Sequence, residues 1–315
     1  MLTDPFFRRR SRIGHHVGVI VHLVDGTYEL YRQHYGQAVR SSAPSPNAAT
    51  IGVLNSTFQL LAEGATHIGV ATDHVIESFR NDLYEGYKTS DGMEPEILTQ
   101  IPIVEEALRA MGVTVWAMEE YEADDALGSA AAVAAADRRV KQVRILSPDK
   151  DLGQCVVGER VVQIDRRKMA KDGTGLVDEA AVIAKFGVSP SSIADWLALV
   201  GDTADGFPGL PGWGAKSASA VLAVYEHIDR IPDRVDDWDV PNLRGAAKLA
   251  TSLADNRDLA ALFLKIATVV TTVPVGSVDE WRWTGPTSDF AEFCRDLGVP
   301  RLADRVAQLA ESTSR

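Results

Sequence analysis

The stretch VGVIVHLVDG, residues 17–26, decides the fold class of this chain. Residues 17–24 are almost continuously apolar and rich in β-branched side chains, which is typical of a strand buried on both faces of a parallel sheet. Asp25 and Gly26 follow directly, so the strand ends on a carboxylate and a turn residue. The stretch therefore predicts a parallel sheet with an acidic side chain at the carboxyl end of a strand.

Further apolar stretches repeat this pattern downstream, and several of them also end in aspartate. They are HIGVATD at 67–73, VTVWAM at 113–118, QVRILSPD at 142–149 and VVQID at 161–165. Segments with helical spacing of apolar residues separate them, at 50–63, 101–111 and 122–139. The alternation predicts an α/β fold with right-handed crossovers between parallel strands, and it places the strand at 161–165 at or beyond the sheet edge.

The pattern changes near residue 178, where apolar strands stop and helical spacing continues to the end of the chain. We therefore expect a sheet domain at 17–178, a helical subdomain at 179–315 and a flexible tail at 1–16. The tail is basic and lacks the apolar core of a secretory signal. No stretch is long and apolar enough to span a membrane.

Charge and cysteine content restrict the class of protein further. Asp and Glu number 44 against 32 Lys and Arg, and the net charge of −12 excludes a generally basic nucleic-acid coat but not a local basic site. The two cysteines, Cys155 and Cys294, lie far apart in apolar contexts. We expect them to be free buried thiols in a reducing cytoplasm.

Acidic residues gather where the strands and one helix would meet. Three follow apolar strands, three open the helix at 122–139, one follows Asp149 closely, and two lie in the later stretch GDTAD. The set is Asp25, Asp73, Asp149; Glu122, Asp124, Asp125; Asp151; Asp202 and Asp205.

If these acids converge, they would take up protons or strain the fold unless divalent cations bind among them. Two carboxylates about 5–6 Å apart repel by roughly 3 kcal/mol at an effective dielectric constant near 20. A ligand set made only of carboxylate oxygens points to Mg²⁺ or Mn²⁺ rather than Zn²⁺. Two such ions are the arrangement used for phosphodiester hydrolysis. A solvated acidic face, with some acids complementing a helix N-terminus, is the alternative.

The segment GDTADGFPGLPGWGAKSASAVL at 201–222 provides a second signal. Its glycines, among them Gly212 and Gly214, allow tight turns before a helix. Backbone N–H groups at that helix N-terminus, with Lys216 and Ser217, are suited to phosphate, and the turn carbonyls to a monovalent cation. A helical hairpin without a ligand is the alternative, and we expect Trp213 to pack within the hairpin.

Residues 79–100 form the least regular stretch, polar and punctuated by glycine. They follow a strand that ends in an acid, and ligands of open α/β sheets bind beyond the carboxyl ends of the strands. We interpret the stretch as an active-site lid or substrate guide, with an inert surface insertion as the alternative.

Taken in order, these motifs resemble the 5′-nucleases, the family of bacterial 5′–3′ exonuclease domains and flap endonucleases. The resemblance runs from about residue 17 to 225 and more loosely beyond. The matching motifs are LVDGTYELYR at 23–32, TDHVIESFRNDLYEGYK at 72–88, EADD at 122–125, SPDKDL at 147–152 and GDTADGFPGLPGWGAKSA at 201–218.

The resemblance implies a PIN-like parallel sheet with helices on both faces, followed by a helical subdomain with a helix–three-turn–helix motif at about 201–222. It implies that the nine acids bind two or more Mg²⁺ or Mn²⁺ ions and that residues 79–102 form a helical arch. Lys88 and Arg80 then contact the scissile phosphate. The implied DNA contacts are Tyr31, Arg32, Gly212, Gly214, Lys216 and Ser217, with K⁺ bound in the hairpin.

The function implied is that of a stand-alone, monomeric, cytoplasmic 5′-nuclease of DNA replication and repair. Its substrate would be DNA with a 5′ flap, nick or overhang, or an RNA–DNA hybrid. The nine acids account for most of the net charge of −12. A haloacid-dehalogenase-type phosphatase is one alternative, although Asp25-Gly26-Thr27 lacks the second acid that its chemistry needs. A catalytically silent DNA-junction-binding protein is the other.

Overall fold

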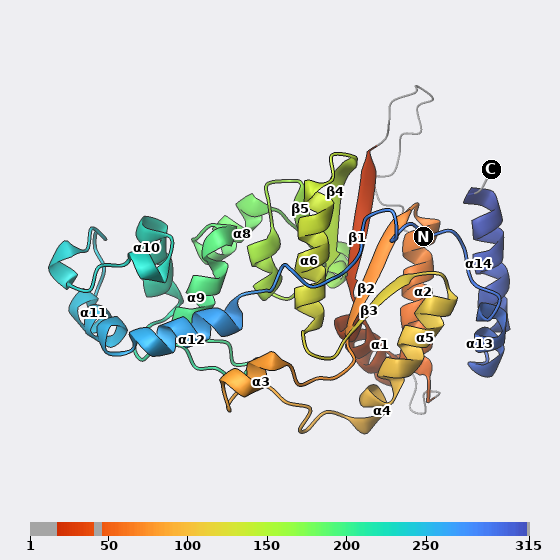
Figure 1. Ribbon diagram of the computed structural model, residues 1–315, viewed down its shortest axis with the longest axis horizontal. Helices are drawn as coiled ribbons and strands as arrows, with labels where there is room; N and C mark the ends of the chain where they lie inside the picture. The colour runs from red at the N-terminus through yellow and green to blue at the C-terminus, as the bar shows by residue number, and fades with distance from the viewer. Residues whose placement is uncertain (1–17, 41–45, 314–315) are drawn as a thin grey trace.

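A six-stranded sheet forms the centre of the molecule, in the order β3-β2-β1-β4-β5-β6 (Figure 1). The computed structural model describes residues 18–40 and 46–313, so the predicted tail at 1–16 lies outside the described residues. Strands β1 to β5 are parallel and β6 is antiparallel to β5, which confirms the predicted α/β sheet. The strands are β1 Val19–Asp25, β2 His67–Asp73, β3 Thr114–Met118, β4 Val140–Leu146, β5 Val161–Ile164 and β6 Leu176–Val177.

Helices cover both faces of this sheet because the buried residues of β1 alternate in direction. Val21 and Leu23 pack with the helix Ala123–Ala136 on one face, and Val24 packs with the helices Ala48–Ala62 and Gln100–Ala110 on the other. The helices of this part are α1 Gly26–Arg40, α2 Ala48–Ala62, α3 Phe79–Leu83, α4 Pro95–Leu98, α5 Gln100–Ala110, α6 Ala123–Ala136 and α7 Arg166–Asp172. The layered arrangement directs the carboxyl ends of β1, β2 and β4 toward the arch segment.

A second core lies beside the sheet and is built from helices and the loops that connect them. Phe207, Trp213 and Phe263 are buried in it, so Trp213 packs within the hairpin as expected. Its helices are α8 Glu179–Phe186, α9 Ile193–Val200, α10 Ala215–Tyr225, α11 Ala246–Asp255 and α12 Arg257–Ala267. Short 3-10 turns complete the chain at Asp151–Cys155, Pro190–Ser192, Ile228–Arg230 and Val235–Asp237.

The last part of the chain returns to the sheet instead of continuing the helical lobe. Residues 268–289 contain no helix, contrary to the expectation of helical structure to the end, and they lie over α6. Trp281 packs edge-on against Trp116 of β3, with ring centroids 5.4 Å apart. Helices α13 Phe290–Asp296 and α14 Pro300–Thr313 then pack against the α2 and α5 side. The sheet is therefore covered partly by a segment distant in sequence.

Both cysteines are free thiols, with Cys294 buried and Cys155 partly exposed. Although the residue is partly exposed, its thiol is enclosed, and this burial raises the pKa of Cys155 to about 12. Among the helices that the structure describes, none has the length and apolar character needed to cross a bilayer.

Candidate metal centre and active site

The carboxyl end of β1 provides the central acidic side chain of the site. Asp25 is the last residue of the strand and is 7% exposed. Its carboxylate accepts hydrogen bonds from the Tyr28 backbone N–H and the Ser147 hydroxyl, both at 2.8 Å. Burial raises the pKa of Asp25 to about 7, and the neighbouring acids Asp73 and Asp149 add to the rise. A carboxylate held this way is available to a cation.

Two more acids approach it from β2 and α6. Asp73 ends β2 and accepts a hydrogen bond from the Ala123 N–H at 2.7 Å, which joins the strand end to the start of α6. Asp124 lies in the first turn of that helix. Burial first, and then the negative charges of Asp149 and Asp25, raise the pKa of Asp124 well above its usual value. The three acids therefore repel one another in the absence of a cation.

These acids line one cavity of about 210 Å³. Five carboxylates contribute to it together with one threonine, two tyrosines and an ammonium group. The lining residues that bear on the chemistry are Asp25, Asp73, Glu122, Asp124 and Asp149, with Thr27, Tyr28, Tyr31 and Lys88. The structure thus brings together acids from four separate sequence motifs.

A second carboxylate cluster lies beyond Asp149. Asp151, Asp202 and Asp205 each place a carboxylate oxygen within 4.8 Å of the others. Burial, followed by repulsion from Asp149, raises the pKa of Asp151 well above its usual value. Its buried Oδ1 has no hydrogen-bond partner among the described residues. An orphaned carboxylate oxygen between two other acids fits a divalent cation.

The two clusters together suit hard divalent cations. All eight side chains donate carboxylate oxygens, which is the ligand preference of Mg²⁺ and similar ions, and no described Cys or His is among them. Burial and the neighbouring acids raise the pKa of Asp25, Asp124 and Asp151, and bound cations would compensate the charge of these carboxylates when they are ionised. The residues present therefore fit more than one metal ion.

Lys88 of the arch joins the two clusters. Its Nζ lies 2.8 Å from Glu122 Oε2 and 2.9 Å from Asp205 Oδ1. Although burial alone would lower it, these two carboxylates raise the pKa of Lys88 well above its usual value. Lys88 is therefore a cation fixed at the rim of the cavity.

Arg80 does not line the cavity. It is 3% exposed, and its guanidinium donates to both carboxylate oxygens of Asp125, to Glu122 and to the backbone carbonyls of residues 266 and 268. All five N–H groups are used, since a guanidinium has five. The phosphate contact predicted for Arg80 has no free donor in this arrangement.

Asp125 is likewise separated from the other acids. It is fully buried, and besides Arg80 it accepts hydrogen bonds from the backbone N–H groups of Val270 and Glu122. These partners saturate its carboxylate. The structure therefore gathers eight of the nine predicted acids and places Asp125 in a buried ion pair beneath them.

The two predicted contacts on α1 differ in their surroundings. Tyr31 lines the cavity and its ring lies 6.3 Å from that of Tyr35. Arg32 instead pairs with buried Glu29 and with the Ser56 hydroxyl. Tyr31 is therefore part of the cavity wall, whereas Arg32 holds α1 against α2.

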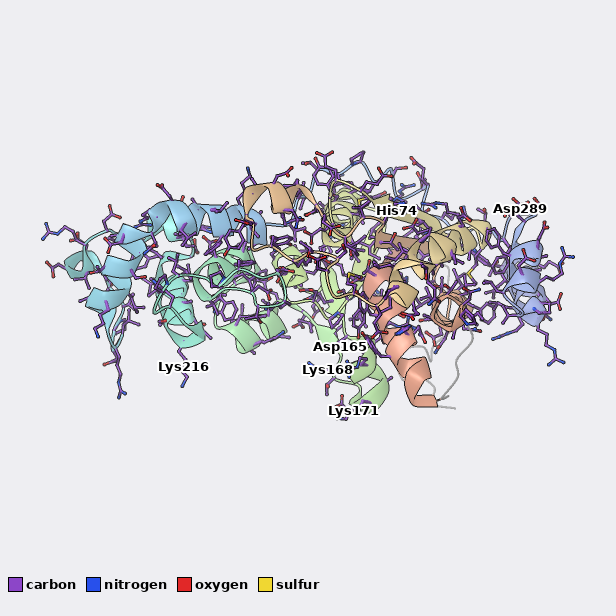
Figure 2. The ribbon with its side chains drawn as sticks, turned by 90° about the horizontal axis from the view of Figure 1, so that it is seen from below. His74, Asp165, Lys168, Lys171, Lys216 and Asp289 are labelled. Atoms are coloured by element: carbon purple, nitrogen blue, oxygen red, sulfur yellow. The ribbon has the colours of Figure 1, made fainter. Side chains whose placement is uncertain are left out.

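The hairpin between α9 and α10 carries the remaining predicted contacts. Gly212 has a φ of +81°, and Gly214 precedes α10, where the Ser217 hydroxyl accepts from its N–H at 3.1 Å. Lys216 is exposed and points away from the body of the molecule (Figure 2). The structure places these residues at one helix N-terminus on the surface of the helical lobe.

The hairpin also contacts the arch. The Lys88 N–H donates to the Asp205 carbonyl at 3.0 Å, and a Cβ added at Gly206 would lie 2.1 Å from the Gly86 carbonyl oxygen. Gly206 has a φ of +87° as well, so only glycine fits this position. The arch and the GDTAD loop are therefore in direct backbone contact.

Sequence reasoning missed the hydroxyl groups that orient the acids. Ser147 donates to Asp25, Ser78 donates to Glu122 at 2.7 Å, and Thr27 accepts from the Asp73 N–H at 2.8 Å. Each lies within two residues of a strand end or helix start near an acid. This position next to a strand end or helix start is the sequence feature that could have indicated these hydroxyls. It is a weak indicator, because Ser and Thr are common in such turns.

The chain matches two family descriptions in succession. Residues 20–187 match the 5′–3′ exonuclease, N-terminal resolvase-like domain, and residues 188–289 match the 5′–3′ exonuclease, C-terminal SAM fold. DNA polymerase I of Pseudomonas aeruginosa is 34% identical over 263 residues, which cover 80% of this chain and 27% of that protein. DNA polymerase I of Bacillus subtilis is 28% identical over 291 residues, which cover 91% of this chain and 32% of that protein. The chain thus spans about a third or less of the length of these curated relatives.

Solved structures share the fold at low sequence identity. The T5 D15 protein co-crystallised with metal ions has a TM-score of 0.63 at 16% identity, over 90% of this chain and 99% of that chain. Flap endonuclease-1 from Methanococcus jannaschii has a TM-score of 0.60 at 15% identity, over 94% of each chain. The T5 D15 flap endonuclease in a pseudo-enzyme–product complex with DNA and metal ions has a TM-score of 0.61 at 16% identity, over 93% of this chain and 99% of that chain.

Proposed function

Because the chain belongs to the 5′–3′ exonuclease family, we propose that it is a metal-dependent nuclease that hydrolyses DNA phosphodiester bonds at 5′ ends and strand junctions. The observation that carries the proposal is the pair of carboxylate clusters joined by Lys88 at the carboxyl ends of the parallel strands. Structures of similar fold include a flap endonuclease complexed with DNA and metal ions.

The first cluster would hold ions nearest the scissile phosphate, and the second cluster would hold a more remote one. Bound there, divalent ions would activate a water nucleophile and stabilise the charge that develops in an in-line displacement. The protein contributes the fixed orientation of the ligands, since Ser147 and the Tyr28 N–H hold Asp25 while the Ala123 N–H holds Asp73. Tyr31 closes one side of the cavity, where it would stack on a terminal base.

We extend the proposal to the finer properties that the resemblance implies. The ions are Mg²⁺ or Mn²⁺, and the substrates are DNA with a 5′ flap, nick or overhang, or an RNA–DNA hybrid. The turn containing Gly212 and Gly214 would bind K⁺ and DNA phosphate. The protein would act as a monomer in the cytoplasm, in replication and repair.

The phosphatase alternative lacks support at its key position. Thr27 stands where the second acid would be needed, and its hydroxyl accepts a hydrogen bond from the Asp73 N–H. The acid that this chemistry needs two residues after the nucleophile, to serve an aspartyl-phosphate intermediate, is therefore missing.

The test is cleavage of 5′-labelled DNA by the purified protein. We expect products only when Mg²⁺ or Mn²⁺ is present, with cuts near the junction of flap substrates. Matched flap, nick, overhang and RNA–DNA substrates rank the preferences by product size. Binding of flap DNA without cleavage in Mn²⁺ would instead identify a silent junction-binding protein, and no interaction with DNA would remove both possibilities.

Substitution of Lys88 tests the electrostatic part of the mechanism. Lys88→Met should lower kcat by about 100- to 1000-fold, the loss typical when one preorganised group that stabilises transition-state charge is removed. The dissociation constant for flap DNA in Ca²⁺ should change far less, because one phosphate contact among many contributes little to affinity. Lys265→Met, at an exposed position of α12, is the matched control and should retain full activity. An unchanged kcat in Lys88→Met would remove Lys88 from the mechanism.

A further inference from the structure

Helix α7 carries an exposed group of cations to which neither the motifs nor the proposed mechanism gives a role. Its sequence RRKMAKD begins after Asp165, whose side chain caps the helix by accepting from the backbone N–H groups of residues 167 and 168. Arg167, Lys168 and Lys171 are exposed, and we call these three residues the basic helix surface. Lys168 lies 3.8 Å from Asp165, whereas Arg167 and Lys171 have no ion-pair partner among the described residues.

The first arginine of the helix acts as an anchor and leaves this surface free. The Arg166 guanidinium lies 3.6 Å from the buried Glu29 carboxylate and donates to the Ser56 hydroxyl. These contacts hold α7 against α1 and α2, the elements that also position Tyr31. The basic helix surface is therefore fixed to the sheet domain through the contacts of Arg166 with α1 and α2.

The basic helix surface lies close to the cavity. Burial raises the pKa of Tyr28, which lines the cavity, and Arg167 is near enough to oppose that rise. Lys168 also shares its surroundings with two other lysines. Partial burial lowers the pKa of Lys185, and the positive charges of Lys168 and Lys150 lower it further. Lys150, Lys168 and Lys185 are therefore near one another, with Asp149 and Asp165 also close by and Lys150 paired with Asp202 at 2.8 Å.

The basic helix surface lies on the same side of the molecule as Lys216 of the hairpin (Figure 2). Lys168, Lys171 and Lys216 all point toward one side of the molecule, along the lower edge of Figure 2. Lys216 belongs to the hairpin proposed above to hold DNA phosphate, and the cavity is lined by residues of the sheet domain, which also carries α7. A straight polyanion laid along this side would meet both sets of cations.

We propose that the basic helix surface on α7 binds the phosphate backbone of the double-stranded arm of the substrate. The inference rests on the proposed function and adds a contact on the sheet domain to the one in the helical lobe. Duplex DNA is the occupant because its charges are regularly spaced and its shape is straight, matching two cationic sites on one side of the molecule. A chain with a net charge of −12 needs such local cations to overcome its repulsion of DNA.

The experiment replaces the three exposed cations together. The variant carries Arg167→Gln, Lys168→Gln and Lys171→Gln, and the matched control carries Arg138→Gln, Lys141→Gln and Arg301→Gln, which remove the same charge at exposed positions away from the cavity. Fluorescence anisotropy in Ca²⁺ measures the dissociation constant for flap DNA across a series of KCl concentrations. Thermal unfolding of both proteins confirms that the fold is intact.

We expect the α7 variant to bind flap DNA at least about 10-fold more weakly than wild type at moderate salt. The slope of log affinity against log salt should fall by roughly 2–3, since each phosphate contact contributes about 0.9. The control should match wild type in both. Equal affinity and slope in the α7 variant and the control would overturn the proposal. An equal loss for a single strand of the same sequence would overturn its assignment to duplex.

Failure of this inference is distinguishable from failure of the proposed function. If wild type binds duplex through α7 but cleaves nothing in Mg²⁺ or Mn²⁺, the nuclease function is wrong and the basic helix surface stands. If wild type cleaves and the α7 variant behaves like the control, only the basic helix surface is wrong.

Discussion

Replacing Asp124 by asparagine should lower the rate of flap cleavage by about 1000-fold or more, because roughly 4 kcal/mol of transition-state stabilisation depends on correctly held metal ions. Asp124 lies in the first turn of α6, and the charges of Asp149 and Asp25 act on it in the same cavity. Asparagine keeps the shape of the side chain but removes one negative charge. The loss should therefore appear in metal binding and in kcat.

The same substitution should stabilise the metal-free protein. Burial and the neighbouring acids raise the pKa of Asp124 well above its usual value, so keeping it ionised at neutral pH costs free energy in the folded state. Removing that charge should raise the free energy of unfolding in EDTA by about 1 kcal/mol or more, or roughly 2–4 °C in Tm. Wild type should recover the difference when Mg²⁺ is added, whereas the variant should gain less from the metal.

Three measurements separate this result from general damage. Single-turnover cleavage gives the rate, calorimetric titration with Mn²⁺ gives metal affinity, and thermal unfolding in EDTA and in Mg²⁺ gives stability. Asp239→Asn, at an exposed position in the loop between α10 and α11, is the matched control and should behave as wild type in all three. Cleavage by Asp124→Asn close to the wild-type rate, with unchanged Mn²⁺ affinity, would contradict the assignment of Asp124 to a metal site.

The strands and the acids at their ends were predictable because local sequence determines both. A parallel strand buried on both faces must be apolar along its length, so VGVIVHLV and QVRILS can be recognised as strands from the sequence. Topology then brings the carboxyl ends of the strands to one edge, and this is why Asp25, Asp73 and Asp149 line a single cavity. Their convergence followed from the fold class alone.

Features set by distant packing were not predictable in this way. The acids of EADD look alike in the sequence, but the helix turns Asp124 toward the cavity and Asp125 toward residues 266–270. The direction of each side chain depends on the position of the segment that follows α12. No local sequence pattern indicates where that segment packs. The helix α1 is also not predictable from local sequence, because Gly26 and the aromatic residues that follow have modest helix propensity. Packing against α2 and the sheet overrides that propensity.

Arg80→Met should destabilise the fold by about 3–5 kcal/mol, the loss typical when one partner of a buried ion pair is removed. Arg80 and Asp125 are both buried, and the guanidinium lies 2.7 and 2.8 Å from the two carboxylate oxygens. Removing Arg80 leaves a buried charge uncompensated and frees two backbone carbonyls near residues 266–268. Urea unfolding, monitored by circular dichroism, measures the loss.

A double variant separates the ion pair from simple loss of packing. Asp125→Asn still accepts from the Val270 N–H but carries no charge, so Arg80→Met with Asp125→Asn should be more stable than Arg80→Met alone. The two substitutions should show a coupling of about 1–3 kcal/mol, as expected for residues in one buried network. Additive losses would show that Arg80 and Asp125 do not act as a pair.

The position of Arg80 also determines how its loss should affect catalysis. Arg80 joins the base of the arch, at α3, to the start of α6 and to the segment after α12, so it orients Glu122 and Lys88 without reaching the cavity. Arg80→Lys should be nearly as destabilising as Arg80→Met, because an ammonium group cannot make five fixed hydrogen bonds. The opposite pattern, in which stability is unchanged while kcat falls about 100-fold or more and Arg80→Lys restores it, would mean that Arg80 contacts the scissile phosphate directly. A buried arginine with every donor used predicts the first pattern.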